Sequence, residues 1–195
     1  MGTVVGIDEV GKGALAGLVV AAAVAYPERP YFDGVPDWWL ELCDSKKLDP
    51  KGPKIARLAS LISALPHGIG LASASEVDEL GVHRAVGLAM ERALRQLAWD
   101  ERPRHPFQIM VDGNSNFGHE NWKTYVRGDA IYSTIAAASI LAKWVLDRLM
   151  RIEIHGRFPE YHFDSHLGYG TRKHMTALRK HGPCEEHRRT FRGVM

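Results

Sequence analysis

The sequence predicts an α/β protein, in which strands and helices alternate along a chain of 195 residues. Short segments rich in β-branched and small apolar residues recur along the chain and indicate strands. Between them, apolar residues recur every three or four positions, which is the spacing of a helix face buried on a core. Alternation of the two patterns is typical of a sheet covered by helices. The expected strands are 4–9, 15–26, 67–75, 107–113 and 124–128, and the expected helices are 51–64, 76–98, 133–148 and 171–181.

The first expected strand ends in two adjacent carboxylates, Asp8 and Glu9, and a short glycine loop follows it. An unpaired carboxylate is costly to bury, so a cation is expected beside this pair, and a divalent metal ion is the best candidate. Gly11 and Gly13 let the backbone approach a ligand closely, and Lys12 between them carries a positive charge. An ordinary strand end whose acids point into water gives the same pattern, so both interpretations stay open at this point.

The second expected strand, 15–26, is uncharged and follows the first after a short loop, so the two strands are expected to pair antiparallel. The segment 67–75 alternates as a third strand does. The long helix at 76–98 places Met90 on its inner face, where methionine fills gaps in the core and need not bind a cofactor. With 45% hydrophobic residues, the chain can bury a core of this kind.

Two lysines, Lys46 and Lys47, lie just before the helix at 51–64. They could grip a phosphate group of a ligand. A solvated helix entrance explains them as well, and the sequence alone favours that simpler interpretation.

The strand at 107–113 ends in Asp112 and a glycine, which repeats the arrangement of the first strand. Open sheets place their ligands beyond the C-terminal ends of the strands. Asp112 can therefore converge with Asp8 and Glu9 if the two strands are neighbours. A simple turn is the alternative, because Asp and Gly favour turns, but the repeated strand-then-acid pattern favours a site.

A carboxylate also lies on the largely apolar face of the helix at 133–148. Steps of three and four residues place Asp147 on one stripe with Ala136, Ile140 and Lys143. Asp147 is thus a candidate for a fourth metal-facing acid. An ion pair between Lys143 and Asp147, four residues apart, is the structural alternative.

The C-terminal part of the chain is basic, whereas the rest is acidic. Residues 143–195 carry a local charge of +5 and residues 1–142 a local charge of −3. This division suits metal ions in the body and a phosphate backbone along the tail, although a solvated surface helix is also compatible with it. Glycines around Tyr169 could expose its ring to a sugar or base, or the ring could pack on the core. A zinc site from His162, His166, Cys184 and His187 has irregular spacing and is a weak signal.

Composition favours a soluble cytoplasmic protein without membrane contact. The two cysteines form no CxxC pair, which indicates a reducing compartment. The uncharged run at 13–26 is shorter than the roughly 20 apolar residues that a membrane helix needs. Acids before that run, where a signal peptide would carry basic residues, argue against secretion.

Together, four carboxylates from two strand ends and a helix indicate a two-metal site. Two divalent ions can activate a water and stabilise the leaving oxygen in phosphodiester cleavage. Hard oxygen ligands without cysteine favour Mg²⁺ or Mn²⁺ over zinc. The residues by themselves therefore predict metal-dependent phosphoryl chemistry.

An ordered set of motifs resembles type 2 ribonuclease H (RNase HII) and extends from residue 4 to about residue 192. The set is specific because the motifs occur in the order found in that family. In chain order they are Gly6-Ile7-Asp8-Glu9-Val10-Gly11-Lys12-Gly13, Asp44-Ser45-Lys46-Lys47-Leu48, Val111-Asp112-Gly113, Gly128-Asp129-Ala130, Ile135 to Lys143 leading to Asp147, Gly168-Tyr169-Gly170-Thr171 and His187-Arg188.

The resemblance implies an RNase H-like fold, with a mixed central sheet of about five strands flanked by helices and a helical C-terminal extension. We expect residues 1–155 to form the catalytic domain and residues 156–195 to form a basic helical extension packed on that same domain. The implied activity is an endoribonuclease that cleaves the RNA strand of RNA–DNA hybrids and incises at ribonucleotides embedded in duplex DNA. Hydrolysis with two metal ions would leave 3′-hydroxyl and 5′-phosphate ends. Such an enzyme would serve ribonucleotide excision repair and DNA replication as a monomer, with a replication clamp as a candidate partner.

Matched position by position, the resemblance also implies roles for individual residues. The metal-binding acids would be Asp8, Glu9, Asp112 and Asp147. The loop Gly11-Lys12-Gly13 would read the 2′-hydroxyl and the adjacent phosphates, which is the contact that distinguishes RNA from DNA. Tyr169 would pack on the sugar at the RNA–DNA junction, and Lys46 would grip the backbone.

Lys12 stands where the type 2 family usually has arginine, and it resembles the type 3 branch. Lysine lacks the bidentate fork of arginine, so the reading of the junction is expected to change. A type 3-like hybrid nuclease with weak junction selectivity is therefore an alternative. A non-catalytic protein that binds RNA–DNA hybrids and a different two-metal nuclease of the same fold, such as a resolvase, are further alternatives.

Overall fold

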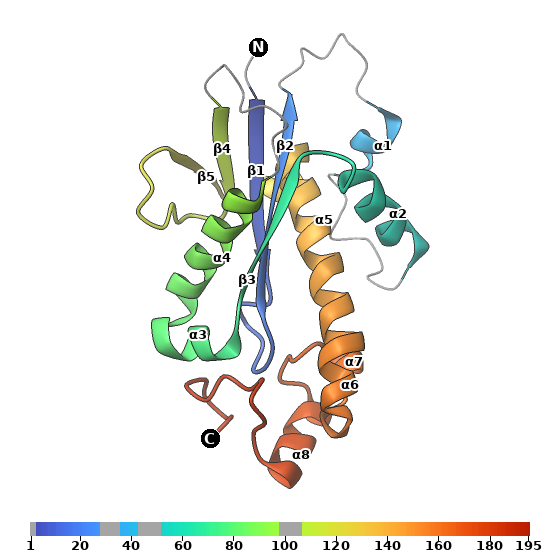
Figure 1. The fold of residues 1–195 in the computed structure, drawn as a ribbon, viewed down its shortest axis with the longest axis vertical. Coiled ribbons are helices and arrows are strands. Elements are labelled where there is room, and N and C mark those ends of the chain that lie inside the picture. Colours follow the sequence, from blue (N-terminus) through green and yellow to red (C-terminus); the bar gives the residue numbers. More distant parts are fainter. Residues whose placement is uncertain (1–2, 28–35, 43–51, 98–106) are drawn as a thin grey trace.

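The computed structural model describes residues 3–27, 36–42, 52–97 and 107–195, in which helices flank a central mixed sheet (Figure 1). The strands are arranged in the order β3-β2-β1-β4-β5. β1 pairs antiparallel with β2, and β2 pairs antiparallel with β3, whereas β1, β4 and β5 run parallel. Their bounds are β1 Thr3–Val10, β2 Val19–Pro27, β3 His67–Ala72, β4 Phe107–Asp112 and β5 Trp122–Tyr125. The predicted mixed sheet and the antiparallel first pair are confirmed.

Hydrophobic residues cover both faces of the sheet, and each face has its own core. In β2, Val20 and Val24 pack toward one core cluster, whereas Val19 and Ala21 pack toward the other. This division follows from the alternation of side chains along a strand. A strand buried on both faces reads as a continuous apolar run, which explains the uncharged sequence of β2.

One long helix covers each face of the sheet (Figure 1). α4 (Val82–Gln96) packs on β3 and β2, and α5 (Ser133–Arg148) packs on β1 and β2. α2 (Pro53–Ile62) packs against α5 and extends the core on that side. The remaining elements are α1 Asp37–Leu40, α3 Ala74–Leu80, η2 Gly128–Ala130, the π-helical turn η3 Leu149–Ile154, α6 His155–Arg157, η4 Pro159–Tyr161, α7 Phe163–His166 and α8 Arg172–His181.

The single helix predicted for residues 76–98 is wrong, because the chain forms two helices there. The first, α3, begins with a capping box in which Ser73 and Glu76 each bond to the backbone of the other. It ends at Gly81, whose φ of 78° lies in the left-handed region. The third strand consequently ends at Ala72 and does not extend to residue 75.

Two strand boundaries also differ from the prediction. The second strand begins at Val19 and not at Leu15, because Gly17 turns the chain with a φ of 88°. The fifth strand covers Trp122–Tyr125 and not 124–128, since the residues from Gly128 form a 3-10 turn that leads into α5.

Both long helices approach the sheet over glycines. A Cβ on Gly6 would collide with the backbone of Thr134 at the start of α5. On the other face, a Cβ on Gly70 would collide with the backbone of Ala89 in α4. Strand and helix backbones therefore lie in direct contact at these points, which fixes the level at which each helix crosses the sheet.

The C-terminal segment returns to the loop between β1 and β2 at the lower end of the sheet (Figure 1). Ala16 forms an isolated antiparallel bridge with His187, and the Gly17 N–H donates to the Glu186 carbonyl at 2.8 Å. The Leu15 N–H donates to the Gly168 carbonyl at 2.9 Å. The last residues of the chain thus help to shape a loop near its beginning. The division of the chain after residue 155 stays a prediction.

Candidate active site

Asp8 and Glu9 lie near the end of β1 and, as neighbours in a strand, project from opposite faces of the sheet. Asp8 lies on the α5 side, where its carboxyl bonds to the Ser139 side chain. Glu9 lines a pocket on the α4 side. The Glu9 backbone N–H also donates to Asp8 Oδ1 at 2.8 Å. The pair therefore offers carboxylate oxygens to both sides of the strand end.

Asp112 lies next to Asp8 because their strands are parallel neighbours. Ile7 is in register with Val111, so the residues that follow them, Asp8 and Asp112, occupy equivalent strand ends. Neighbouring strands lie about 4.8 Å apart. Burial raises the pKa of the Asp8 carboxyl well above its ordinary value, and repulsion from Glu9 and then from Asp112 raises it further. The structure confirms that the two strands are neighbours, which was the condition for the three acids to lie at one edge of the sheet. Their roles in a site stay a prediction.

Asp129 joins this edge, although we did not select it as a site residue. It lies in η2, and its backbone N–H donates to Asp112 Oδ1 at 3.4 Å. The residue is 3% exposed, which is unusual for an aspartate. The motif Gly128-Asp129-Ala130 was visible in the sequence, but its position beside Asp112 depends on the turn after β5. Only the fold reveals it.

Asp147 lies apart from the three acids and has a different partner. It is buried on α5, and its Oδ2 forms an ion pair with Arg151 Nε at 2.5 Å. The structural alternative paired Asp147 with Lys143, one turn before it, whereas the observed ion pair is with Arg151, one turn after it. Asp147 lies eight residues beyond Ser139, the partner of Asp8, which is about 12 Å along a helix. Within the described residues, Asp147 Oδ1 is buried without a hydrogen-bond partner.

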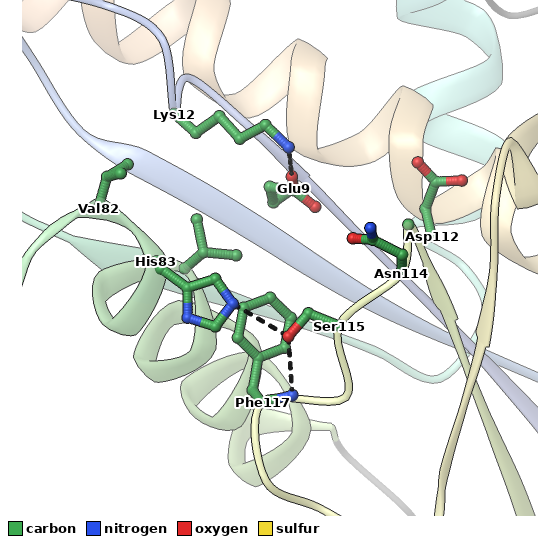
Figure 2. A pocket seen from close by; sticks show the side chains of 10 residues that line it. Glu9, Lys12, Val82, His83, Asp112, Asn114, Ser115 and Phe117 are labelled. Atoms are coloured by element: carbon green, nitrogen blue, oxygen red, sulfur yellow. Dashed lines mark hydrogen bonds and ion pairs between the residues drawn. The ribbon is translucent and has the colours of Figure 1, made fainter.

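A pocket of about 290 Å³ opens beside Glu9 and Asp112 (Figure 2). Lys12 extends toward Glu9, and their Nζ and Oε1 atoms lie 2.9 Å apart. The opposite wall is formed by His83, whose Nε2 lies 3.0 Å from Ser115 Oγ. The sequence did not point to His83 or Ser115, because the wall forms only when the loop after β4 packs on α4.

The expected substrate-binding residues Gly13 and Tyr169 lie close together. A Cβ on Gly13 would lie 3.9 Å from a ring carbon of Tyr169, and the ring is 40% exposed. The hydrogen bond to Glu9 raises the pKa of Lys12, which keeps the ammonium charged. Lys46 lies outside the described residues.

The donor set suits a hard divalent cation, although the side chains do not form a closed cage. In the described part of the chain, no group of three or more His, Cys, Asp or Glu side chains is arranged to hold a metal ion. That result applies equally to the weak zinc pattern around His166, Cys184 and His187. The acids at the strand ends are oxygen ligands. The raised pKa of Asp8 reflects first its burial and then repulsion from Glu9 and Asp112, and a cation would offset both. The residues therefore fit Mg²⁺ or Mn²⁺, which would have to draw the carboxylates inward.

The fold matches solved structures of ribonucleases H. It is similar to ribonuclease H2 from Pyrococcus horikoshii OT3, with a TM-score of 0.70 and 23% identity over 98% of this chain and 95% of that chain. It is similar to RNase HII in the PCNA:RNase HII complex from Archaeoglobus fulgidus, with a TM-score of 0.66 and 23% identity over 95% and 92% of the two chains. It is also similar to Bst-RNase HIII in complex with Mn²⁺, with a TM-score of 0.63 and 19% identity over 99% of this chain and 68% of that chain. The fold class is thus that of the ribonucleases H.

Sequence comparison identifies the family within that class. The family model for ribonuclease HII matches residues 5–194. Ribonuclease HII of Syntrophotalea carbinolica is 48% identical over 98% of this chain and 86% of its own length. Ribonuclease HII of Burkholderia pseudomallei is 42% identical over 98% of this chain and 84% of its own length. The chain belongs to the ribonuclease HII family and is a ribonuclease H, a hydrolase that acts on nucleic acid. Among the described residues, no helix has the length and apolarity needed to cross a membrane.

Proposed function

We propose that this protein is an endoribonuclease that cleaves the RNA strand of RNA–DNA hybrids and incises at ribonucleotides embedded in duplex DNA. The products would carry 3′-hydroxyl and 5′-phosphate ends. The observation that carries the proposal is the pair Asp8 and Asp112 at equivalent ends of adjacent parallel strands, with Glu9 and Lys12 at the adjoining pocket. A family member with this set of acids has the groups that metal-dependent phosphodiester hydrolysis requires.

Asp8, Glu9 and Asp112 would hold the divalent ions, Mg²⁺ or Mn²⁺. Two such ions supply activation of the attacking water and charge stabilisation of the leaving oxygen. The chain itself supplies the position of the carboxylates, since β1 and β4 fix them on one edge. Bst-RNase HIII, solved in complex with Mn²⁺, is a structural neighbour that supports this choice of ions.

We propose Asp129 as the fourth acid in preference to Asp147. The Asp129 backbone contacts the Asp112 carboxylate, so the two residues share one edge of the sheet. Asp147 is engaged by Arg151, whose charge already compensates the carboxylate. A structural role for Asp147 in α5 explains its burial without a metal ion.

The loop Gly11-Lys12-Gly13 and Tyr169 would read the ribonucleotide. Gly13 faces the Tyr169 ring, and that ring is open enough to stack on a sugar or base. Backbone groups of a glycine loop can bond to a 2′-hydroxyl, which DNA lacks. Lys12 would contribute a point charge to the flanking phosphates. Lys46 remains part of the proposal as a backbone contact.

Three features of the wider proposal follow from family membership. The enzyme would act as a monomer in the cytoplasm, in ribonucleotide excision repair and DNA replication. A replication clamp is the proposed protein partner, because RNase HII of Archaeoglobus fulgidus was solved in complex with PCNA. Residues 1–155 would form the catalytic domain, and residues 156–195 its basic extension.

The test uses two labelled substrates, a DNA duplex with one ribonucleotide and a continuous RNA–DNA hybrid. Each is incubated with Mg²⁺ and with Mn²⁺, beside an Asp112→Asn control. Incision at the single ribonucleotide, lost in the control, is the expected result. Binding of both substrates without cleavage would instead support a non-catalytic hybrid-binding protein, and cleavage of branched all-DNA substrates would support a resolvase.

The type 3-like alternative has a specific observation in its favour, which is Lys12 in place of arginine. Cleavage of the continuous hybrid alone would support that alternative. Lys12→Arg then provides a matched variant, because the side chain keeps its charge and gains a bidentate fork. If Lys12 sets the selectivity, this variant will raise incision at the single ribonucleotide relative to the hybrid.

A further inference from the structure

Arg188 is a buried cation without a carboxylate bonded to its guanidinium in the described residues. Its side chain is fully buried, and it donates from Nε and Nη2 to the Gly17 carbonyl at 3.2 and 3.0 Å. A third bond runs from Nη1 to the Lys12 carbonyl at 3.0 Å. Both acceptors belong to the loop between β1 and β2. One guanidinium therefore holds this loop at two points, five residues apart.

The neighbouring residue, His187, reaches the other side of the site through a chain of hydrogen bonds. The Cys184 backbone N–H donates to His187 Nδ1 at 3.0 Å, so the His187 proton resides on Nε2. His187 Nε2 then donates to His174 Nε2 at 3.1 Å, which leaves the His174 proton on Nδ1. His174 Nδ1 donates to the Tyr169 carbonyl at 3.0 Å. Both imidazoles are neutral in this arrangement, and burial lowers the pKa of each.

The C-terminal segment is itself anchored at a third point. Asp78, near the end of α3, accepts the backbone N–H groups of Arg189 and Thr190 at 2.8 and 2.9 Å. The Arg188 N–H donates to the Leu15 carbonyl at 2.9 Å. The dipeptide His187-Arg188 thus has a fixed backbone from which its two side chains extend.

We propose that His187 and Arg188 are positioning residues that hold the two halves of the ribonucleotide-reading site, the loop Gly11-Lys12-Gly13 and Tyr169, in one fixed arrangement. The inference rests on the proposed function, because it assumes that this loop and Tyr169 read the substrate. It goes beyond that function by assigning the assembly of the reading site to two residues that do not touch the substrate.

Peptide geometry explains how each contact acts. In a trans peptide the C=O and the following N–H point in opposite directions. With the Lys12 carbonyl directed at the buried guanidinium, the Gly13 N–H is directed away from Arg188. In the same way, the bond from His174 helps to fix the peptide between Tyr169 and Gly170, whose carbonyl also accepts the Thr171 N–H at 2.7 Å. Both elements that face the ribose are therefore preorganised, which reduces the entropy lost on binding.

The experiment measures kcat/KM on the single-ribonucleotide duplex and on the continuous hybrid for the same enzyme preparation. The ratio of the two values is the readout, because a loss of folded enzyme lowers both equally and leaves the ratio unchanged. Arg188→Gln and His187→Gln are expected to lower the ratio about tenfold. Arg188→Lys keeps the charge but lacks the planar fork, so its ratio should fall between those of the wild type and Arg188→Gln.

The matched control is Arg189→Gln, which changes the same side chain at the next, exposed position. Its ratio should equal that of the wild type. Equal losses on both substrates in Arg188→Gln and His187→Gln would overturn the inference, since a merely structural role predicts that result. A ratio in Arg189→Gln as low as in Arg188→Gln would overturn it as well.

Tyr169→Ala separates the inference from the function on which it rests. If Tyr169→Ala leaves the ratio unchanged, the proposed reading role of Tyr169 fails. If Tyr169→Ala lowers the ratio but His187→Gln and Arg188→Gln do not, only the positioning inference fails. If all three lower it, adding His187→Gln to Tyr169→Ala should lower the ratio no further, because the histidine acts through the tyrosine. A lower ratio in the double variant than in Tyr169→Ala would contradict the inference that His187 acts through Tyr169.

Discussion

The strand-end site and the C-terminal segment both bury charged or titratable groups, but they satisfy them differently. At the strand ends, burial raises the pKa of Asp8, and the two neighbouring carboxylates raise it further. Around the C-terminal segment, the guanidinium of Arg188 is bonded to two carbonyls, and His187 is bonded at both ring nitrogens. The first region would be stabilised by a ligand of opposite charge, whereas the second is satisfied by hydrogen bonds within the chain itself.

This difference indicates that the strand-end acids serve the reaction, whereas the C-terminal segment serves to hold the structure in place. A cluster of like charges lowers stability and persists where function requires it. A satisfied polar network makes its region rigid and fixes one arrangement of the backbone. Substitutions in the two regions should therefore change activity and stability in different combinations.

The largest effect is expected from Asp112→Asn, which removes one of the repelling charges. Cleavage of both substrates should fall by roughly a thousandfold or more, because a metal-binding oxygen is lost. The free energy of unfolding without metal should rise by about 1 kcal/mol, since Asp8 loses a like-charged neighbour. Urea unfolding and cleavage assays measure the two changes, and duplex binding should remain measurable. Full activity in this variant would contradict the assignment of Asp112.

The next largest effect distinguishes the two candidates for the fourth acid. Asp129→Asn should lower kcat by about a hundredfold, whereas Asp147→Asn should lower it by less than about tenfold. In Asp147→Asn, the main loss should be stability, because Arg151 would remain half-buried without a carboxylate and would keep only its bond to the Asp164 carbonyl. Cleavage kinetics and thermal unfolding of the two variants provide the comparison. The reverse order of kcat losses would restore Asp147 to the site.

A smaller effect should appear in the pH dependence of stability. Burial, and then repulsion from His174, lowers the pKa of His187 to about 4, against an ordinary value of 6.5. Below pH 6.5, His187 binds a proton in the unfolded chain but stays neutral in the folded chain. Stability therefore falls as the pH falls. The contribution of His187 should lower the free energy of unfolding by about 2 kcal/mol at about pH 5. This decrease should level off below the pKa of His187 in the folded chain.

His187→Gln provides the comparison for that pH profile. Urea unfolding of the wild type and of this variant should show a shallower slope in the variant between pH 6.5 and about pH 5. His166 and His174 also have lowered pKa values and will contribute a residual slope, while Cys184 and Arg189 are the other titratable neighbours. Identical slopes in the two proteins would show that His187 is not held neutral.

The smallest effect is expected from Tyr161→Phe in the C-terminal region. The Tyr161 hydroxyl donates to the Gly182 carbonyl at 2.7 Å, and the substitution removes only that bond. The free energy of unfolding should fall by about 1 kcal/mol. The ratio of activities on the two substrates should not change, because phenylalanine keeps the ring that packs on His187 with centroids 4.8 Å apart. A changed ratio would mean that the scaffold and the site are more tightly coupled than the contacts indicate.

Much of the fold was predictable because hydrophobic periodicity dominates it. The helix at 133–148 has the predicted bounds, and the strand ending at Asp112 was located to within one residue. The break at Gly81 was not predicted, because apolar spacing continues across it on both sides. A single left-handed residue can redirect a helix without disturbing that periodicity.

At the site, the sequence predicted the acids that end strands but not those placed by turns. Asp8 and Asp112 follow apolar runs, and parallel pairing then brings them together. Asp129 reaches Asp112 through the turn after β5, whose path depends on tertiary packing. Asp147 was selected because it lies on a buried helical stripe, and that pattern also fits an ion pair with Arg151. Periodicity identifies a buried acid but not its partner.

The glycines beneath the two helices have a consequence for the sequences that this architecture can accept. Gly6, Gly68 and Gly70 each face helix backbone, which cannot rotate away as a side chain can. In a library randomised at these positions, even alanine should be lost from the folded population. By contrast, Gly156 has open space around it and no left-handed φ, so most residues should be recovered there. Tolerance to substitution would then mark the lines along which helix and sheet touch.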